Sequence, residues 1–490
     1  MSVPTTRYSS LKLDSLTINS TLNEVEKLLK EDKQLSPALK ATISALVVLV
    51  KLLADRVGLN SQNSSKPPST DSDANKKKKK KQNRNNSGRN SGGQKGHVGT
   101  TLEQIENPDD IKLLKIDRRT LPKGNYEEAG YSIRQVFDID ITRWVTEYQA
   151  QILINKETGQ QHTASFPENI TKAVQYGNKL KAHAVYMSQY QLIPYLRVKE
   201  YFTELLGIPI SEGSLFNFNN AAYKKLKTFE EITIQKLIDA PILHVDETGI
   251  NINGEKYWLH CATNASWTYF FPHERRGTEA TDAAGILEFY KGVLCHDHWK
   301  PYYTYTGCLH SLCNAHHLRE LERAWEQDGM QWAKQLKALL EAMNRAVHEA
   351  GGKLANKDSK RYWDKYRSLL KNAETECPPP DEKDRKGKRG KLKRSKARNL
   401  LERLVDFEED VLRFMDNEVV PFTNNQGERD IRMTKVHQKI SGCFRSIDGA
   451  EMFCRIRGYL LTCRKQGVSS AEAMELLFDD DLPEFASNIL

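Results

Sequence analysis

Two short apolar runs in the middle of the chain are each followed by an aspartate. The run PILHV at 241–245 directly precedes Asp246. The run from Val293 to Cys295 is separated from Asp297 by one histidine. Short apolar runs bounded by polar residues are typical of buried strands. An acid at the end of such a strand is well held and faces solvent. The sequence therefore predicts a central sheet that carries two carboxylates.

The neighbouring segments extend this pattern into an α/β layout. Further strands are expected at 256–263 and 267–271, a helix at 282–290, and another strand at 308–313 before a strongly helical stretch. Three strands, a helix, a strand bearing an acid and another strand–helix unit form the layout of a ribonuclease H-like domain. Carboxylates at strand ends converge in that layout.

Two divalent metal ions that promote phosphoryl transfer need oxygen ligands from several elements, so a third acid is required. The best candidate is Glu428, on a helix that Asn424 is expected to cap. Arg432 and Lys435 share one face of that helix with Glu428 and would meet phosphate. Taken singly, each acid is more often a surface charge than a ligand. The acids most easily mistaken for members of the triad are Glu247, Asp282 and Asp430.

Histidine and cysteine residues follow the second aspartate. They resemble zinc ligands by type, but the spacing C-x-H-x-x-C-x-x-H is not that of a standard zinc site, and we predict no zinc. Either of the last two histidines is a candidate to position phosphate or water near the acids. The roles of His296 and His298, which flank Asp297, stay open. The cluster consists of Cys308, His310, Cys313, His316 and His317.

A helix of about six turns is expected between Ser36 and Gly58, because Ser-Pro is a helix-start signal and glycine a stop signal. Its apolar residues follow the a/d spacing of a heptad repeat, which favours a dimerising coiled coil. The alternative is an amphipathic helix on the core of its own domain. The longest apolar run, 45–50, is far shorter than a membrane span, so no membrane role is expected. The seam consists of Leu39, Ile43, Leu46, Val50, Leu53 and Val57.

The basic charge is confined to two segments. Residues 66–97 carry a net charge of +8 and residues 383–398 carry +9, whereas the whole chain carries +9. This distribution predicts a polyanionic partner bound by tails or loops. Six consecutive lysines could neutralise DNA phosphates, although a solubilising tether is an equally good interpretation. They are Lys76, Lys77, Lys78, Lys79, Lys80 and Lys81.

Between the first basic segment and Asp246, the pattern changes from strands to helices. Residues 131–154 alternate and are rich in β-branched and aromatic types, so strands are expected there. A break at Gly207 and a new helix near Ser211 resemble a helix-turn-helix, with an ordinary helical hairpin as the alternative. All eight cysteines lie beyond residue 260 without paired spacing, and the N-terminus lacks a signal pattern. These features predict a reduced, cytoplasmic protein.

Several blocks, in order over residues 60–470, resemble conserved segments of the insertion-sequence-66 family of DDE transposases. They are NSSKPPS, GGQKGHVG, YGNKLKAHAVYMSQYQLIPYLRV, HVDETG, HDHWKPY, LCNAHHLRELE, TNNQGERDIR and KISGCFRS followed by GAEMFCRIRGYLLTCRKQG. The resemblance implies a ribonuclease H-like catalytic domain with the triad Asp246, Asp297 and Glu428. It also implies two Mg²⁺ or Mn²⁺ ions, and cleavage and strand transfer on double-stranded DNA at element ends and target.

As further expectations, the protein would be a homo-oligomer, would work with accessory proteins of the same element and would associate with the nucleoid when bound to DNA. DNA contacts are expected from the lysine run and from Arg432, Lys435, Lys439 and Arg445. The chain departs from the family in two respects. The first is that residues 1–260 contain no cysteine for the usual zinc-ribbon-like segment, and the second is the length of the stretch between Asp297 and Glu428. The long stretch between Asp297 and Glu428 implies an insertion with helices at 331–350, 359–373 and 397–417.

The expected fold class is α/β plus α. Its parts are an N-terminal dimerisation helix (1–59), a disordered basic linker (60–103), a small β domain (104–166), a helical DNA-binding region (167–240), a ribonuclease H-like core (241–325 and 419–470), a helical insertion with a basic loop (326–418) and a C-terminal tail (471–490). Two alternatives to a transposase remain. A structure-selective nuclease on the same fold would cleave without joining, and in a non-enzymatic DNA-binding or architectural protein the acids would be dispensable.

Overall fold

The computed structural model describes residues 15–32, 34–57, 59–64, 102–381 and 392–487. Contacts divide the chain into two units. The first comprises Met1–Ser72 and Ala150–Leu490, and the second comprises Asp73–Gln149.

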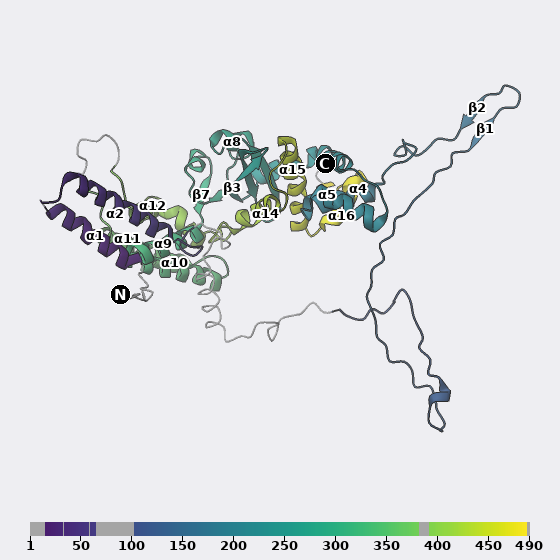
Figure 1. The fold of residues 1–490 in the computed structure, drawn as a ribbon, viewed down its shortest axis with the longest axis horizontal. Helices are drawn as coiled ribbons and strands as arrows, with labels where there is room; N and C mark the ends of the chain where they lie inside the picture. The colour runs from purple at the N-terminus through teal and green to yellow at the C-terminus, as the bar shows by residue number, and fades with distance from the viewer. Residues whose placement is uncertain (1–14, 33, 58, 65–101, 382–391, 488–490) are drawn as a thin grey trace, which may run out of the picture. The chain divides into compact units, whose positions relative to one another are not determined.

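A mixed five-stranded sheet forms the centre of the first unit (Figure 1). Its strand order is β5-β4-β3-β6-β7, in which β3, β4 and β5 are antiparallel neighbours, whereas β6 runs parallel to β3 and β7. The five strands expected between residues 241 and 313 are confirmed, so the core is α/β. They are β3 (Ile242–Ile252), β4 (Glu255–Thr263), β5 (Thr268–His273), β6 (Val293–His296) and β7 (Leu309–Leu312).

A two-residue turn joins β3 to β4. Asn253 and Gly254 have φ angles of 50° and 90°, the left-handed conformations of the Asn-Gly turns that favour tight hairpins. The turn sets a register in which Asp246 lies opposite Cys261. Asp246 therefore lies in the middle of a long hairpin, just beyond the last residue of β3 that pairs with β6.

The helix predicted at 282–290 is wrong in position and length. The helix α8 spans Thr278–Ala283 and is followed by Gly285, whose φ of 70° is the left-handed conformation typical of a residue just past a helix end. Ile286 and Tyr290, within the predicted range, are instead buried in a loop that packs into the core of the sheet.

The helices that directly precede the strands in the sequence and those near the C-terminus cover the sheet. Leu243 and Val245 of β3 belong to one core, with the preceding helices and α15 and α16, whereas Ile250 and Ile252 belong to a second core, with α14. The break at Gly207 is present, and Ser211 begins α6 as predicted. The helices are α4 (Asn178–Val185), α5 (Tyr195–Glu200), α6 (Glu212–Lys225), α7 (Lys227–Ile238), α14 (Asn425–Ser441), α15 (Ile447–Lys465), α16 (Ser470–Phe478) and α17 (Glu484–Ser487).

The helices predicted between Asp297 and Glu428 are present and share a core that includes Trp332 and Tyr366 and also Val293 of β6 and Leu312 of β7. The last predicted helix is divided, since α12 ends at Asp406 and a short helix follows. Residues 382–391 of the basic loop lie outside the described residues. The helices are α9 (Asn314–Asp328), α10 (Gln331–Glu349), α11 (Asn356–Glu376), α12 (Lys396–Asp406) and α13 (Glu408–Leu412).

Near the N-terminus, α1 (Ser15–Glu31) and α2 (Pro37–Val57) pack together, and α1 contacts α9 (Figure 1). The predicted helix start is confirmed, because the backbone amide of Leu39 donates to Ser36 Oγ at 3.3 Å. The segment Pro37–Ala54 is also long and apolar enough to cross a membrane. The uninterrupted apolar run at 45–50 is only one part of this segment and did not indicate it. Core helices and signal sequences share these properties, so this helix is weak evidence for a membrane location.

The strands predicted over 131–154 are mostly not formed. Within the described stretch 102–151 the chain is largely extended without strand pairing, and β1 (Ile152–Ile154) pairs with β2 (Gln161–Thr163) as an isolated ribbon. Val136 and Trp144 are each 90% exposed. Alternation predicts a strand only where another surface buries the apolar side, and a lone two-stranded ribbon is at best marginally stable.

Candidate active site

Asp246 and Asp297 occupy matching positions on two neighbouring parallel strands. Asp297 follows β6 as predicted, but the prediction that Asp246 ends its strand is wrong, because the hairpin continues β3 to Ile252. His244 of β3 pairs with Cys295 of β6, and each aspartate comes two residues later. Neighbouring strands lie about 4.8 Å apart, and the charge of Asp297 is among the causes that raise the pKa of Asp246. The structure therefore brings the two predicted aspartates together.

Glu428 approaches the aspartates from the first turn of α14. A Cβ on the preceding residue, Gly427, would lie 3.4 Å from the Cβ of Asp246 and 3.3 Å from the side-chain amide of Asn424. The glycine therefore allows the helix to pass close to β3. The charge of Glu428 also raises the pKa of Asp246, so the three predicted carboxylates form one electrostatic cluster.

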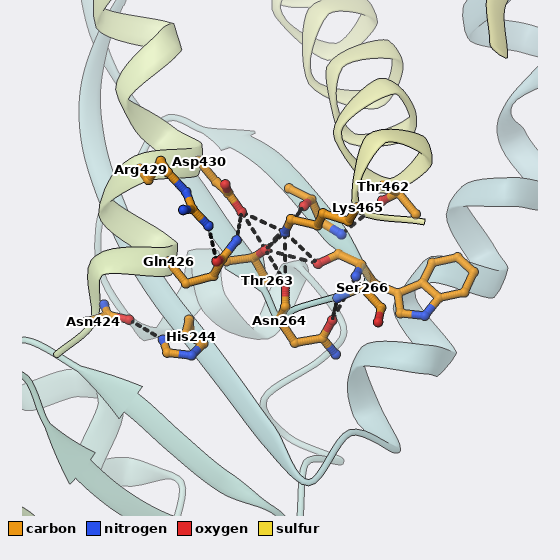
Figure 2. Close-up of polar contacts among 12 residues, drawn as sticks. His244, Thr263, Asn264, Ser266, Asn424, Gln426, Arg429, Asp430, Thr462 and Lys465 are labelled. Atoms are coloured by element: carbon orange, nitrogen blue, oxygen red, sulfur yellow. Dashed lines mark hydrogen bonds and ion pairs between the residues drawn. The ribbon is translucent and has the colours of Figure 1, made fainter. Parts of the chain in front are cut away.

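Asn424 attaches the start of α14 to the sheet. It precedes the helix as predicted, but among the described residues its side chain makes no capping hydrogen bond. Its Nδ2 instead donates to the carbonyl oxygen of Val245 at 2.8 Å, and its Oδ1 lies 2.8 Å from Nδ1 of His244 (Figure 2). Its backbone amide donates to Sγ of Cys313 at 3.1 Å. Asn424 thus ties the helix that carries Glu428 to the strand residue just before Asp246.

The charged form of Asp246 is disfavoured in the protein. Burial, followed by the charges of Glu247, Asp297 and Glu428, raises the pKa of Asp246 to about 8, against the hydrogen bond from the Glu247 amide. A nearby cation would reverse this effect by stabilising the carboxylate. The oxygen donors of Asp246, Asp297 and Glu428 are of the type that Mg²⁺ and Mn²⁺ prefer, so the residues fit the metal that the family implies.

Asp246→Asn should raise the melting temperature of the chelator-treated protein at pH 8 but not at pH 4. The folded-state pKa of Asp246 lies above its ordinary value of 3.8. Its contribution to stability is therefore full below that value and is lost as the pH rises through about 8. Asparagine removes this pH-dependent loss. Thermal unfolding followed by circular dichroism would test this, with the exposed Asp282→Asn as control. Equal shifts at both pH values would contradict the explanation.

Two acids that the sequence could not separate from the triad have other partners. The side chain of Glu247 is 2% exposed, and it accepts hydrogen bonds from the Tyr302 hydroxyl at 2.6 Å and from Arg276 Nε at 2.9 Å. Asp282 accepts a hydrogen bond from the Tyr305 hydroxyl at 2.6 Å. Glu247 is therefore paired with Tyr302 and Arg276, although its charge still contributes to the raised pKa of Asp246.

Asp430 belongs to a buried polar network beside α14 (Figure 2). Nζ of Lys465, near the end of α15, lies 2.7 Å from Oδ2 of Asp430, and Gln426 Nε2 donates to the same oxygen at 2.8 Å. The network joins α14 and α15 to the turn between β4 and β5. The carboxylate of Asp430 is bound by these contacts. Lys465 also donates to Oγ1 of Thr263, the carbonyl oxygens of Asn264 and Trp267, and Oγ1 of Thr268.

The structure separates the members of the histidine and cysteine cluster. His316 Nδ1 lies 3.8 Å and Cys313 Sγ 4.0 Å from Oε1 of Glu428. His317 is 2% exposed, and its Nδ1 lies 3.0 Å from Oδ1 of Asn314. Of the two histidines proposed to act near the acids, the structure therefore places His316 against Glu428. The remaining members contact other residues, since Cys308 donates to Tyr305 and His310 lies against His296.

Arg319 also lies near the carboxylate of Glu428, and the sequence analysis did not predict a role for it. Its Nη2 is 4.0 Å from Oε1 of Glu428. Arginine is well suited to bind phosphate oxygens, so this side chain is a candidate contact for DNA. The signal was available, because Arg319 follows His316 by three residues in an expected helix, a spacing that places both side chains on one face.

The predicted DNA-contacting residues of α14 and the loop after it lie mostly at the surface. Arg432, Lys435, Lys439 and Arg445 are all exposed. The ammonium group of Lys435 donates to the carbonyl oxygen of Gly249 on β3, and the partial burial of this group lowers its pKa. The lysine run 76–81 lies outside the described residues.

The sequence matches the Transposase IS66 family over residues 173–452, more than half of the chain. The chain therefore belongs to the IS66 family of transposases, as the resemblance of its blocks predicted. Membership makes it a DNA-processing enzyme, and the matched range contains Asp246, Asp297 and Glu428. A second match, to a family of unknown function (DUF6444), covers residues 13–103. No curated protein matches the chain.

Proposed function

We propose that the protein cleaves and joins DNA at the ends of an insertion sequence, with Asp246, Asp297 and Glu428 as catalytic carboxylates. The observation that carries this proposal is the matching register of the two aspartates, together with the charge that Glu428 adds to the same cluster. The sheet order supports a ribonuclease H-like fold, since three antiparallel strands are continued by two parallel ones.

Residues of the chain hold the proposed ligands in place. Backbone amides donate to Oδ1 of both aspartates, from Glu247 to Asp246 at 2.9 Å and from Trp299 to Asp297 at 3.0 Å. These bonds leave the second oxygen of each carboxylate for a cation. Two bound Mg²⁺ or Mn²⁺ ions would supply charge stabilisation to the attacking and leaving oxygens of a phosphoryl transfer.

The proposed reaction has two transfers and no covalent bond between protein and DNA. Water first displaces the bridging 3′ oxygen at the element end, which leaves a free 3′-OH. That hydroxyl then attacks a phosphodiester of the target DNA, which joins the two strands and releases the target's own 3′-OH. Arg319, on the helix face next to Glu428, would bind a phosphate oxygen during these steps.

The test is an assay of strand transfer by the full-length protein. A labelled duplex with the terminal sequence of its element would be incubated with a supercoiled plasmid in Mg²⁺ or in EDTA. Joined products in Mg²⁺ alone are expected. Cleavage without joining would instead identify a nuclease, and DNA binding without any product would favour an architectural protein.

The exposed face of α2 supports self-association, which would bring two element ends together. Four residues of the predicted heptad seam are 42–61% exposed, whereas Val47 on another face of the helix is 5% exposed. A seam of this kind becomes buried when it pairs with a second copy. The four exposed residues are Leu39, Leu46, Val50 and Leu53.

Leu46→Glu combined with Leu53→Glu should convert an oligomer of the full-length protein into a monomer, because buried carboxylates without partners are strongly unfavourable. Light scattering coupled to size-exclusion chromatography measures the mass directly. The matched control is Leu49→Glu with Leu52→Glu, since these leucines are equally exposed but lie off the seam. A monomeric unaltered protein, or equal dissociation by both pairs, would contradict the prediction.

A further inference from the structure

Three side chains of different chemistry converge where α9 meets α14. The ligand atoms of Cys313, His316 and Glu428 all lie within 4.8 Å of one another. Cys313 immediately precedes α9, His316 lies in its first turn, and Glu428 lies in the first turn of α14. Glu428 belongs to this group and also to the electrostatic cluster with the two aspartates.

Two features distinguish this group from ordinary packing. Within the described part of the chain, the buried Nδ1 of His316 has no hydrogen-bond partner and lies 3.8 Å from Oε1 of Glu428. An unsatisfied buried nitrogen is unfavourable unless something else binds it. Cys313 Sγ accepts the backbone amide of Asn424, but burial outweighs this bond and raises the pKa of the thiol to about 11, so a bound cation would have to displace the thiol proton. The first ligand thus has a supporting hydrogen bond, and the second has a vacant nitrogen.

The spacing of the ligand atoms fits a small tetrahedral ion. Zinc binds sulfur at about 2.3 Å and nitrogen or oxygen at about 2.0–2.2 Å, so its ligands lie roughly 3.3–3.8 Å apart. The separations from Glu428 Oε1 are 3.8 Å to His316 and 4.0 Å to Cys313, and all three atoms lie within 4.8 Å of one another, so a contraction of at most about 1 Å would bring them to these distances. Arg319 Nη2, 4.0 Å from the same oxygen, opposes a cation, but its side chain is 27% exposed and can turn toward solvent.

We propose that Cys313, His316 and Glu428 form a binding site for one Zn²⁺ ion. The set of sulfur, nitrogen and oxygen donors selects a zinc-like cation over Mg²⁺, which prefers oxygen ligands. Binding itself is independent of the proposed catalysis. Its consequence rests on the proposed function: a zinc ion here would occupy Glu428 and inhibit Mg²⁺-dependent joining.

The site escaped prediction because three neighbours in sequence do not contribute to it. Cys308, His310 and His317 made the spacing unlike a zinc motif, and the structure directs all three to other partners. The third ligand is Glu428, more than 100 residues after His316. Only folding brings it to the Cys-x-x-His pair.

Binding can be measured without activity by using Co²⁺ as a spectroscopic probe for zinc. Chelator-treated full-length protein titrated with Co²⁺ should develop visible bands of a tetrahedral ion and a near-ultraviolet sulfur-to-metal band, saturating at one equivalent. Added Zn²⁺ should remove both. Cys313→Ser should abolish the sulfur band, and His316→Gln should weaken binding at least roughly 100-fold, the upper end of the loss for an outer-shell partner.

The matched control is Cys443→Ser, which removes the one exposed cysteine among the described residues and should leave the spectrum unchanged. No sulfur band in the unaltered protein, or a band that persists in Cys313→Ser, would overturn the proposal. Should Cys313→Ser fail to fold, His316→Gln decides, because glutamine preserves size and polarity. A normal cobalt spectrum with no strand transfer in Mg²⁺ would refute the proposed function alone, whereas active protein without the band would refute the zinc site alone.

Discussion

Asp297→Asn should reduce strand transfer by about 10³-fold, at the upper end of the loss when one electrostatic stabiliser of a transition state is removed. Asparagine retains an oxygen that can accept the Trp299 amide, which now donates to Oδ1 of Asp297 at 3.0 Å. The local backbone should therefore stay in place, and only the charge toward a cation is lost. Single-turnover joining in Mg²⁺, with DNA affinity measured separately by fluorescence anisotropy, distinguishes a chemical defect from a binding defect.

Asp282→Asn is the matched control for this experiment. Asp282 is one of the acids most easily mistaken for a member of the triad, but its carboxylate accepts a hydrogen bond from the Tyr305 hydroxyl. Its replacement should change the rate of joining by less than about threefold, because substitutions at exposed positions usually alter the free energy of unfolding by at most ~0.5 kcal/mol. If Asp282→Asn were the inactive variant and Asp297→Asn the active one, the assignment of the second catalytic acid would be wrong.

The two aspartates were predictable because their signal is local. Each follows a short apolar run that has to be buried, and Asn253 with Gly254 specifies the hairpin that extends β3 beyond Asp246. The sequence also indicated the order of strands and helices along the chain. Strand pairing turns these local signals into a shared site, since Asp246 and Asp297 occupy matching positions on neighbouring strands.

Other predictions failed where local periodicity had no tertiary support. At 282–290 the left-handed conformation of Gly285 ends the helix early. Over 131–151 alternating apolar residues are exposed and unpaired in the described structure, because no sheet lies beside them. Apolar patterns report which side chains prefer burial, but the burying surface decides the backbone conformation.

The contacts that hold Glu428 could not be predicted, because each joins residues far apart in sequence. Asn424 was expected to cap its own helix, yet its amide binds Val245, 179 positions away. The partner of Asp430 is Lys465, on the following helix, which also donates to Thr263 and Asn264 at the turn between β4 and β5. Such polar contacts produce no periodic pattern in the sequence from which they could be predicted.

Lys465→Met should destabilise the protein by about 3–5 kcal/mol, because it leaves Asp430 as an uncompensated buried charge. The side chains of Lys465 and Asp430 are 13% and 6% exposed, so solvent screens the pair little. Methionine keeps much of the volume of lysine, and the loss therefore reports the charge rather than a cavity. The midpoint of urea unfolding measures it.

The matched comparison is the double variant Lys465→Met with Asp430→Asn. Asparagine can still accept the hydrogen bonds that Thr263 and Gln426 now donate to Asp430 Oδ2, but it carries no charge to be left unpaired. The double variant should therefore be more stable than Lys465→Met alone. A single substitution that costs under about 1 kcal/mol, the range of a solvated ion pair, would show that water replaces Lys465. Because Asp430 lies two residues after Glu428, Lys465→Met should also slow joining under conditions where the protein stays folded, and the double variant should recover part of that rate.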